Sequence, residues 1–263
     1  MSGRRESLLD QPTMRGQMAR QLLSAAKGIL LDWDGCVAVE NRVLCAARKL
    51  IEQHADRVAI VSNNSTHISA DLAAILARHG LSVPEDRILL AGVEAIRLVS
   101  ARRTKRVMLI GSPKIRQFAR AQGVLLVRES ADLVVVARDA RFTYAKLERA
   151  ANALQRGADL VVANADRTHP GAGNRIVPET GSLVAALLAC VDGARDRMQM
   201  IGKPAPLLFE LACERLSIAP EEAVMIGDNP ETDGEGAKRA GIHAILVGGA
   251  SPLRLDHLVE PHP

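Results

Sequence analysis

Short, unbroken apolar runs alternate with amphipathic segments along most of the chain. Ten of these runs are rich in Val, Ile and Leu: 29–32, 57–62, 87–91, 106–111, 124–127, 132–137, 159–164, 198–202, 223–228 and 243–248. Because runs without polar alternation are typical of strands covered on both faces, they predict parallel sheets. The segments between them have helical periodicity, as in 144–157, where Gly157 would end a helix.

This alternation of strands and helices predicts a doubly wound, Rossmann-like α/β fold. Ten strands are many for one sheet in a chain of 263 residues. We therefore expect two α/β units.

Composition excludes several classes of protein. Aromatic residues make up only 2% of the chain and the formal net charge is +4, so the chain lacks the stacking platform and the strong basic patch of a nucleic-acid-binding protein. None of the four cysteines forms a CxxC pair, which favours reduced thiols. Neither a signal peptide nor a membrane span is recognisable, so we expect a cytoplasmic protein without a membrane partner.

Polar residues follow four of the predicted strands, where ligands bind in open parallel sheets. They are Asp32 and Asp34, then Ser62, Asn63 and Asn64, then Lys203, and finally Asp228 and Asp233. Each segment alone is also typical of a polar turn or a helix cap. Their common position at strand ends favours one site that holds a divalent cation and a phosphoryl group.

The residue types suggest roles in phosphoryl chemistry. A carboxylate can attack phosphorus and form an aspartyl-phosphate, and Mg²⁺ would offset the repulsion between the two anions. Asp228 can add a metal-binding oxygen, Lys203 a positive charge and Ser62 a hydrogen bond to the transferring oxygens. Asp34 can protonate the leaving alcohol and then deprotonate water.

These segments resemble the four motifs of the haloacid dehalogenase superfamily of aspartate-nucleophile phosphatases. "DWDGCV", "SNNST", "GKP" and "GDNPETDGEGAKRAG" are similar to the first to fourth motifs in order, and the resemblance extends from residue 27 to about 248. About 140 residues separate the second and third motifs, which resembles the NagD-like, nitrophenylphosphatase-like branch with its large α/β cap. Residues 163–187 are similar to the cap-closing signature of that branch.

The resemblance implies a role for each matching residue. Asp32 would be the nucleophile, and Asp34 the acid and base, with its backbone carbonyl also reaching Mg²⁺. Asp228 would be a metal ligand, and Asp233 would hold either the metal's waters or Lys203. The phosphate-binding residues would be Ser62, Asn63, Asn64 and Lys203. His169 would be a cap residue that reaches the substrate. Cys36 departs from the usual Thr or Val, and a cysteine can pack like a valine.

The inserted cap sets the predicted domain boundaries. We place the hydrolase core at 22–103 and 199–255, the cap at 104–198, an N-terminal arm at 1–21 and a C-terminal tail at 256–263. The arm is expected to be mobile or to form an extra helix. Related caps often mediate dimers, so a second copy of the chain is one expected partner.

The sequence therefore predicts a Mg²⁺-dependent phosphatase that acts on small phosphorylated metabolites. The compatible substrates are sugar phosphates, glycerol phosphate, phosphoglycolate, nucleotide monophosphates and pyridoxal phosphate. The scarcity of aromatic residues disfavours a substrate whose base or pyridine ring is bound by stacking. One alternative is a receiver module that keeps its phosphoryl group, which the length of the chain and Asp34 disfavour. Another is a catalytically idle binding protein on the same fold, which the presence of Asp32 and Asp34 disfavours.

Overall fold

The chain folds into two compact units of α/β structure. The computed structural model describes residues 12–102, 105–171, 173, 175–249 and 251–259. Unit 1 comprises Met1–Val61, Ala73–Ile88 and Phe209–Pro263, and unit 2 comprises Ser62–Leu72 and Leu89–Leu208.

A five-stranded sheet forms the centre of unit 1, with strand order β13-β12-β1-β4-β5. Its strands are β1 (Gly28–Leu31), β4 (Val58–Ser62), β5 (Ile88–Leu90), β12 (Ala223–Gly227) and β13 (His243–Leu246). β1 pairs in parallel with β12 on one side and β4 on the other. Every residue of β1, β4, β5 and β12 is buried, which explains why their sequences lack polar alternation.

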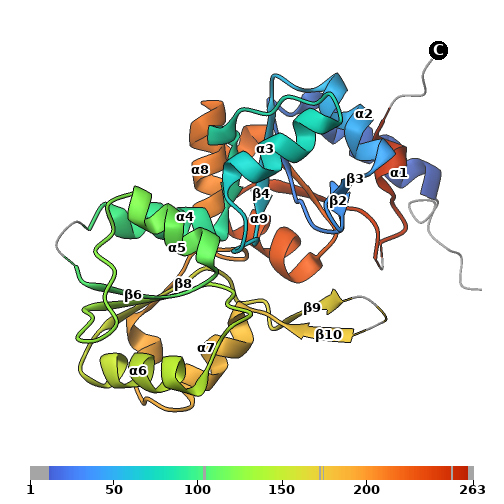
Figure 1. Ribbon diagram of the computed structural model, residues 1–263. Coiled ribbons are helices and arrows are strands. Elements are labelled where there is room, and N and C mark those ends of the chain that lie inside the picture. The colour runs from blue at the N-terminus through green and yellow to red at the C-terminus, as the bar shows by residue number, and fades with distance from the viewer. Residues whose placement is uncertain (1–11, 103–104, 172, 174, 250, 260–263) are drawn as a thin grey trace, which may run out of the picture. The chain divides into compact units, whose positions relative to one another are not determined.

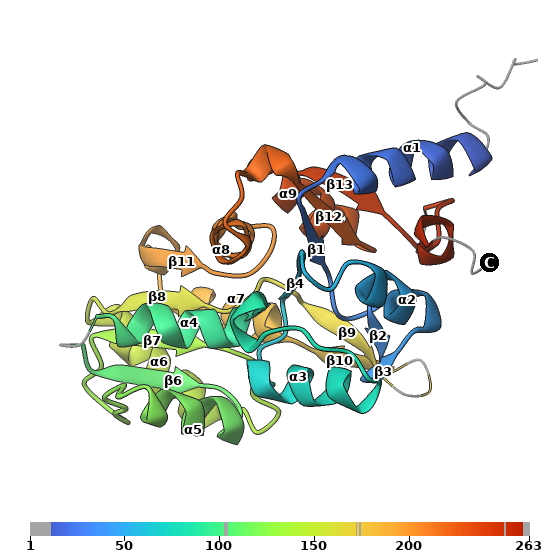
Figure 2. The same ribbon diagram turned by 90° about the horizontal axis from the view of Figure 1, so that it is seen from above.

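Helices and short turns complete unit 1 (Figure 1). They are α1 (Pro12–Ala25), α2 (Cys45–Gln53), α3 (Ser69–Arg78, whose first turn belongs to unit 2), η2 (Glu85–Arg87), α8 (Leu207–Leu216, whose first two residues belong to unit 2), η5 (Pro220–Glu222), the π-helical η6 (Pro230–Gly234), α9 (Glu235–Arg239) and η7 (Leu255–Leu258). Figure 2 shows α1 near the C-terminal end of the described chain, where Arg20 Nη1 donates a 2.7 Å hydrogen bond to the His257 carbonyl. A small antiparallel hairpin, β2 (Ala38–Val39) and β3 (Arg42–Val43), follows β1.

Unit 2 contains a four-stranded parallel sheet in the order β11-β8-β7-β6. Its strands are β6 (Val107–Ile110), β7 (Leu133–Val136), β8 (Asp159–Val162) and β11 (Met198–Met200), and its helices are α4 (Ala91–Ser100), α5 (Pro113–Ala121), α6 (Tyr144–Gln155), α7 (Thr180–Leu188) and η4 (Ala194–Arg197). Figure 1 shows α4 and α5 on one face of this sheet and α6 and α7 on the other. An antiparallel hairpin, β9 (Thr168–Gly171) and β10 (Arg175–Pro178), stands apart from the sheet.

The predicted α/β fold with parallel sheets is confirmed, and nine of the ten predicted runs contain strands. The strand predicted at 124–127 is wrong. Only an isolated bridge joins Leu126 to Val107, and Leu125 is 58% exposed, so the apolar run is not covered on both faces as a strand inside the sheet would be. The sequence pattern also missed the two antiparallel hairpins: β2 and β3 are only two residues long, and β9 and β10 include polar residues and proline.

The domain boundaries remain a prediction. Of the predicted arm, residues 12–21 belong to helix α1 and the others lie outside the described residues. Of the predicted tail, residues 256–258 belong to η7.

Candidate active site

Two neighbouring strands of the unit 1 sheet each end at an aspartate. Leu31 of β1 lies opposite Ile226 of β12, and the backbone N–H of Asp32 continues the ladder with a 2.9 Å hydrogen bond to the Ile226 carbonyl. Asp228 follows β12 directly after Gly227. Because parallel strands end at the same edge of a sheet, this pairing brings residues that are almost 200 positions apart in sequence into one place.

A group of three carboxylates forms at this edge. Asp32, Asp228 and Asp233 each offer a carboxylate oxygen, and these oxygens lie within 4.8 Å of one another. Asp32 and Asp233 are buried and Asp228 is half-buried. Three like charges in a partly buried space repel one another, so such a group is stable when a cation or protons compensate it.

Local backbone structure fixes the third carboxylate of the group. After β12 the chain forms the π-helical turn η6, in which Asn229 Oδ1 accepts hydrogen bonds from the N–H groups of Glu231 and Thr232 at 2.9 and 3.3 Å. The N–H of Asn229 donates to Asp233 Oδ2 at 3.1 Å. The turn η6 therefore places Asp233 back at the end of β12, close to Asp228.

In the turn after β1, the side chains of Trp33 and Asp34 lie in opposite environments. Trp33 is completely buried, and its indole Nε1 lies 3.4 Å from Asn41 Oδ1 in the β2–β3 hairpin. Asp34 is exposed and lies outside the group of three carboxylates. Gly35 makes the turn with a φ of 86°, a conformation that L side chains rarely adopt. An exposed carboxylate beside the buried group can exchange protons with a substrate or water.

The second predicted motif forms a polar loop that begins at the end of β4. Ser62, the last residue of β4, is buried, and its Oγ accepts a 3.1 Å hydrogen bond from the Asn64 N–H. Asn64 Oδ1 accepts from the N–H groups of Thr66 and His67 at 3.0 and 2.9 Å, which closes the loop on itself. The loop therefore holds the hydroxyl of Ser62 in a fixed position.

Within unit 2, Asn63 links this loop to Lys203. Asn63 Nδ2 donates to the Lys203 carbonyl at 3.0 Å and to Asp166 Oδ1 at 3.2 Å. Lys203 is only 2% exposed, and the Lys203–Pro204 peptide bond is cis. At the preceding Gly202, a Cβ would meet Asn63 Oδ1 at 2.5 Å, so the "GKP" motif needs its glycine for this close approach.

The sequence pattern does not identify Ser65 or its partners as site residues. Ser65 is buried, and its Oγ accepts hydrogen bonds from the Arg138 N–H at 3.0 Å and from Asn164 Nδ2 at 3.4 Å. It also lies 3.3 Å from the hydroxyl of Thr180, which is completely buried. Asn164 and Thr180 fall within 163–187, the segment that resembles the cap signature, but their common partner is not readable from spacing.

His169 belongs to a charged group in unit 2. It lies on β9 opposite Val177 of β10, and its Nδ1 is 2.7 Å from Glu179 Oε1. Arg138 Nε is 3.3 Å from the same oxygen, and Arg138 Nη2 is 3.4 Å from His169 Nε2. Burial raises the pKa of the Glu179 carboxyl, although Arg138 and His169 act in the opposite direction. His169 thus lies beside a carboxylate rather than standing alone in a loop.

A family model places the chain among known proteins. The model of the haloacid dehalogenase-like hydrolases matches residues 26–241. The chain belongs to the haloacid dehalogenase-like hydrolase family. It is 32% identical to chronophin from Rattus norvegicus over 258 residues, which cover 91% of this chain and 82% of that protein.

Solved structures of this family have the same fold. A 4-nitrophenylphosphatase from Thermotoga maritima has a TM-score of 0.78 and 28% identity, with 88% of this chain and 90% of that chain covered. A glycerol phosphate phosphatase from Mycobacterium tuberculosis in complex with magnesium has a TM-score of 0.75 and 28% identity, with 86% and 69% covered. The family and its phosphatase members confirm the predicted phosphoric monoester hydrolase of the nitrophenylphosphatase-like branch.

The donor set of the carboxylate group fits a divalent cation. Haloacid dehalogenase-like phosphatases use such a metal, and carboxylate oxygens are the ligands that hard cations prefer. Asp32, Asp228 and Asp233 would hold it through one oxygen each.

Among the residues that the structure describes, no helix is long and apolar enough to cross a membrane.

Proposed function

We propose that this enzyme hydrolyses small phosphomonoesters, of the sugar phosphate or glycerol phosphate class, with Asp32 as nucleophile and Mg²⁺ as cofactor. The observation that carries the proposal is the group of Asp32, Asp228 and Asp233 at the carboxyl ends of β1 and β12. The magnesium complex of the glycerol phosphate phosphatase supports the metal and the substrate class. Phosphoglycolate and nucleotide monophosphates stay within the proposal.

The proposed reaction has two steps. In the first, an oxygen of Asp32 attacks phosphorus, the P–O bond to the alcohol breaks, and Asp34 gives its proton to the leaving oxygen. In the second, Asp34 takes a proton from water, which attacks the aspartyl-phosphate and releases inorganic phosphate and the Asp32 carboxylate. Mg²⁺, when bound, supplies positive charge that offsets the repulsion between the carboxylate and the phosphate.

The remaining predicted residues take part in binding. Lys203 and Ser62 would stabilise the phosphoryl oxygens, with Asn63 and Asn64 shaping the loop that carries them. His169 would reach the substrate from the inserted residues. A homodimer through these inserted residues also stays a prediction.

The test is phosphate release from a panel of small phosphomonoesters, with Mg²⁺ and with EDTA, for the wild type and Asp32→Asn. Asn is close to Asp in shape and is a poor nucleophile, so we expect a folded variant without turnover. Metal-dependent release that disappears in the variant would support the proposal. Substantial turnover by Asp32→Asn would show that Asp32 is not the nucleophile. Turnover by the wild type that is unaffected by EDTA would show that the reaction needs no metal.

A further inference from the structure

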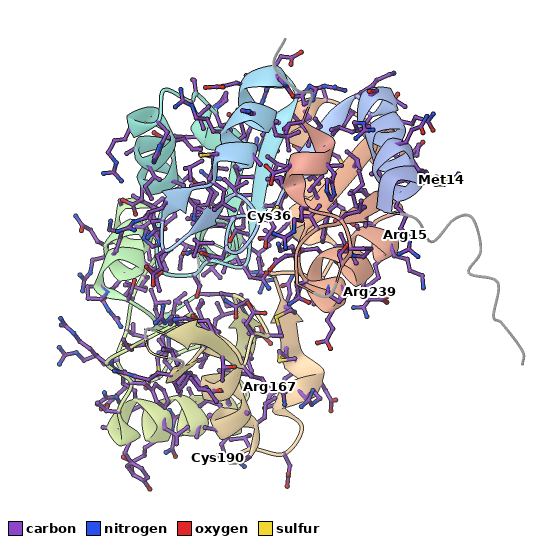
Figure 3. The ribbon with its side chains drawn as sticks, turned by 90° about the vertical axis from the view of Figure 1, so that its right-hand side faces the viewer. Met14, Arg15, Cys36, Arg167, Cys190 and Arg239 are labelled. Atoms are coloured by element: carbon purple, nitrogen blue, oxygen red, sulfur yellow. The ribbon has the colours of Figure 1, made fainter. Side chains whose placement is uncertain are left out.

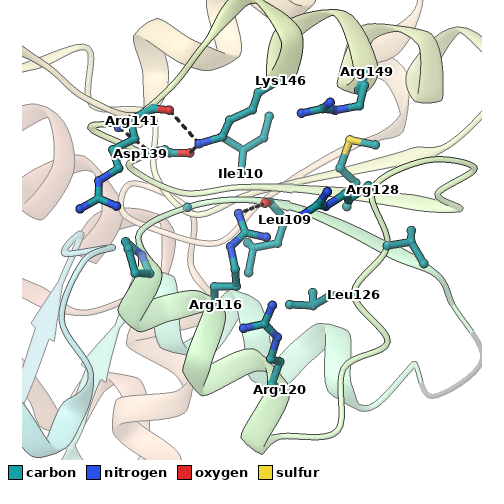
Figure 4. Close-up of a pocket in the computed structure, with 14 residues that line it drawn as sticks. Leu109, Ile110, Arg116, Arg120, Leu126, Arg128, Asp139, Arg141, Lys146 and Arg149 are labelled. Atoms are coloured by element: carbon teal, nitrogen blue, oxygen red, sulfur yellow. Dashed lines mark hydrogen bonds and ion pairs between the residues drawn. The ribbon is translucent and has the colours of Figure 1, made fainter.

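Unit 2 contains a cavity of about 670 Å³ around the C-terminal half of β6 (Figure 4). Its apolar lining consists of Met108, Leu109, Ile110, Pro113, Leu126 and Val127. None of its lining residues belongs to the four motifs or to the group around His169. The volume lies within the roughly 300–1,000 Å³ range of sites for small organic ligands.

Basic side chains dominate the polar lining of this cavity. Six cations line it, Arg116, Arg120, Arg128, Arg141, Lys146 and Arg149, against one carboxylate, Asp139. Figure 4 shows Arg116 and Arg120 of α5 on one side of the cavity and Lys146 and Arg149 of α6 on the other. The two sets of cations thus flank an apolar floor at the edge strand β6, one from each face of the sheet.

Only part of this charge is compensated within the protein. Lys146 Nζ lies 2.6 Å from Asp139 Oδ2 and donates to the Arg141 carbonyl at 2.8 Å. Arg116 Nη2 donates to the Leu109 carbonyl at 2.8 Å, which positions a half-buried guanidinium at the floor. In the described part of the chain, no carboxylate lies within ion-pair distance of Arg120, Arg128, Arg141 or Arg149.

Some pairs in this arrangement oppose the stability of the fold. Arg116 and Arg120 are four residues apart on α5, and like charges at that spacing destabilise a helix. Lys146 and Arg149, three residues apart on α6, repel each other in the same way. A guanidinium presents a planar fork of donors that matches the oxygens of a phosphate group. An anionic ligand would turn this repulsion into attraction.

We propose that the cavity binds a small organic molecule with at least two phosphate groups, at a site separate from the phosphatase motifs. One phosphate would contact Arg116 and Arg120, the other would contact Arg149 and Arg128, and the body of the ligand would lie on the apolar floor. This inference is independent of the proposed reaction, because it requires no turnover and no metal.

Calorimetric titration with adenosine 5′-(α,β-methylene)diphosphate tests the proposal. Its P–C–P bridge resists phosphatase action, and EDTA in the buffer keeps the carboxylate group of unit 1 without a cation. We expect saturable binding to the wild type and at least tenfold weaker binding to Arg120→Gln/Arg149→Gln. These two arginines are exposed, so their replacement leaves the core intact. Adenosine, which lacks phosphate, should not bind.

The matched control is Arg156→Gln/Arg195→Gln, which removes two exposed arginines of unit 2 that do not line the cavity. Its dissociation constant should stay within twofold of the wild type. An absence of saturable binding by the wild type would overturn the proposal. So would an equal loss in the two double variants, which would indicate non-specific attraction, or undiminished binding by Arg120→Gln/Arg149→Gln, which would place the ligand elsewhere.

Discussion

The Asp228 carboxylate lies directly against the backbone of Gly35: a Cβ at position 35 would stand 2.5 Å from Asp228 Oδ2. Gly35 also has a φ of 86°. The position therefore demands glycine both for its conformation and for the space that Asp228 occupies. This relationship joins the first and fourth motifs, which are far apart in sequence.

Gly35→Ala should weaken Mg²⁺ binding by displacing the Asp228 carboxylate. The control is Gly80→Ala, since Gly80 has a similar φ of 74° but, among the described residues beyond its chain neighbours, no atom within 4 Å of the Cβ position. Both variants should lose about 1–2 kcal/mol of unfolding free energy from backbone strain. Only Gly35→Ala should also lose metal affinity in calorimetric titration with Mg²⁺. Equal Mg²⁺ affinities of Gly35→Ala and Gly80→Ala would show that Asp228 does not bind the metal.

Asp34→Asn should lower kcat by roughly 10²–10⁴-fold, because it removes the group that transfers protons in both proposed steps. With p-nitrophenyl phosphate the leaving group needs little protonation, so the second step should become slow and a burst of nitrophenol should precede steady turnover. Stopped-flow absorbance measures this burst. Glu40→Gln, a nearby exposed carboxylate in the same hairpin region, is the control and should leave kcat unchanged. An unchanged rate in Asp34→Asn would move the acid and base to another residue.

Ser65→Ala should destabilise the protein by about 1–3 kcal/mol. It leaves the Arg138 N–H without its acceptor and removes one of the two hydrogen bonds of Asn164 Nδ2, which keeps its bond to the Asn63 carbonyl. A part-buried donor without a partner is costly. Urea unfolding measures the difference. Ser182→Ala removes a single hydrogen bond to the Arg167 carbonyl at a more exposed position, so it should cost less than half as much. Similar losses of unfolding free energy in the two variants would show that the hydrogen bonds around Ser65 stabilise the protein no more than the single bond of Ser182.

Thiol labelling should distinguish two pairs of cysteines. Cys45 and Cys190 are exposed, whereas Cys36 and Cys213 are buried, and Figure 3 shows Cys190 at the surface of unit 2. Burial raises the pKa of the Cys213 thiol to about 11, so at pH 8 roughly one molecule in 1,000 would carry its thiolate. A thiol-reactive disulfide reagent at pH 8 should modify two thiols in the folded protein and four in urea. Rapid modification of a third thiol without denaturant would contradict the burial of Cys36 or Cys213.

The sequence by itself determined most elements of this protein and the positions of its motifs. Apolar runs without alternation identify buried parallel strands, because a strand covered on both faces has no polar side. The ends of those runs are equally local features, so the amino-acid pattern alone locates Asp32, Ser62, Lys203 and Asp228 at or just after strands. The exposed hairpin of β9 and β10 has no such run, which is why the pattern missed it.

Only the tertiary structure decided which of these residues meet. Pairing of β1 with β12, almost 200 residues later, brings Asp32 beside Asp228, and the turn in η6 adds Asp233. The shared hydrogen-bond acceptor at Ser65 and the opposed arginines of α5 and α6 likewise depend on contacts between distant segments. Periodicity reports the environment of each residue along its own strand or helix, whereas the order of strands in a sheet and the partners across it follow from the packing of the whole chain.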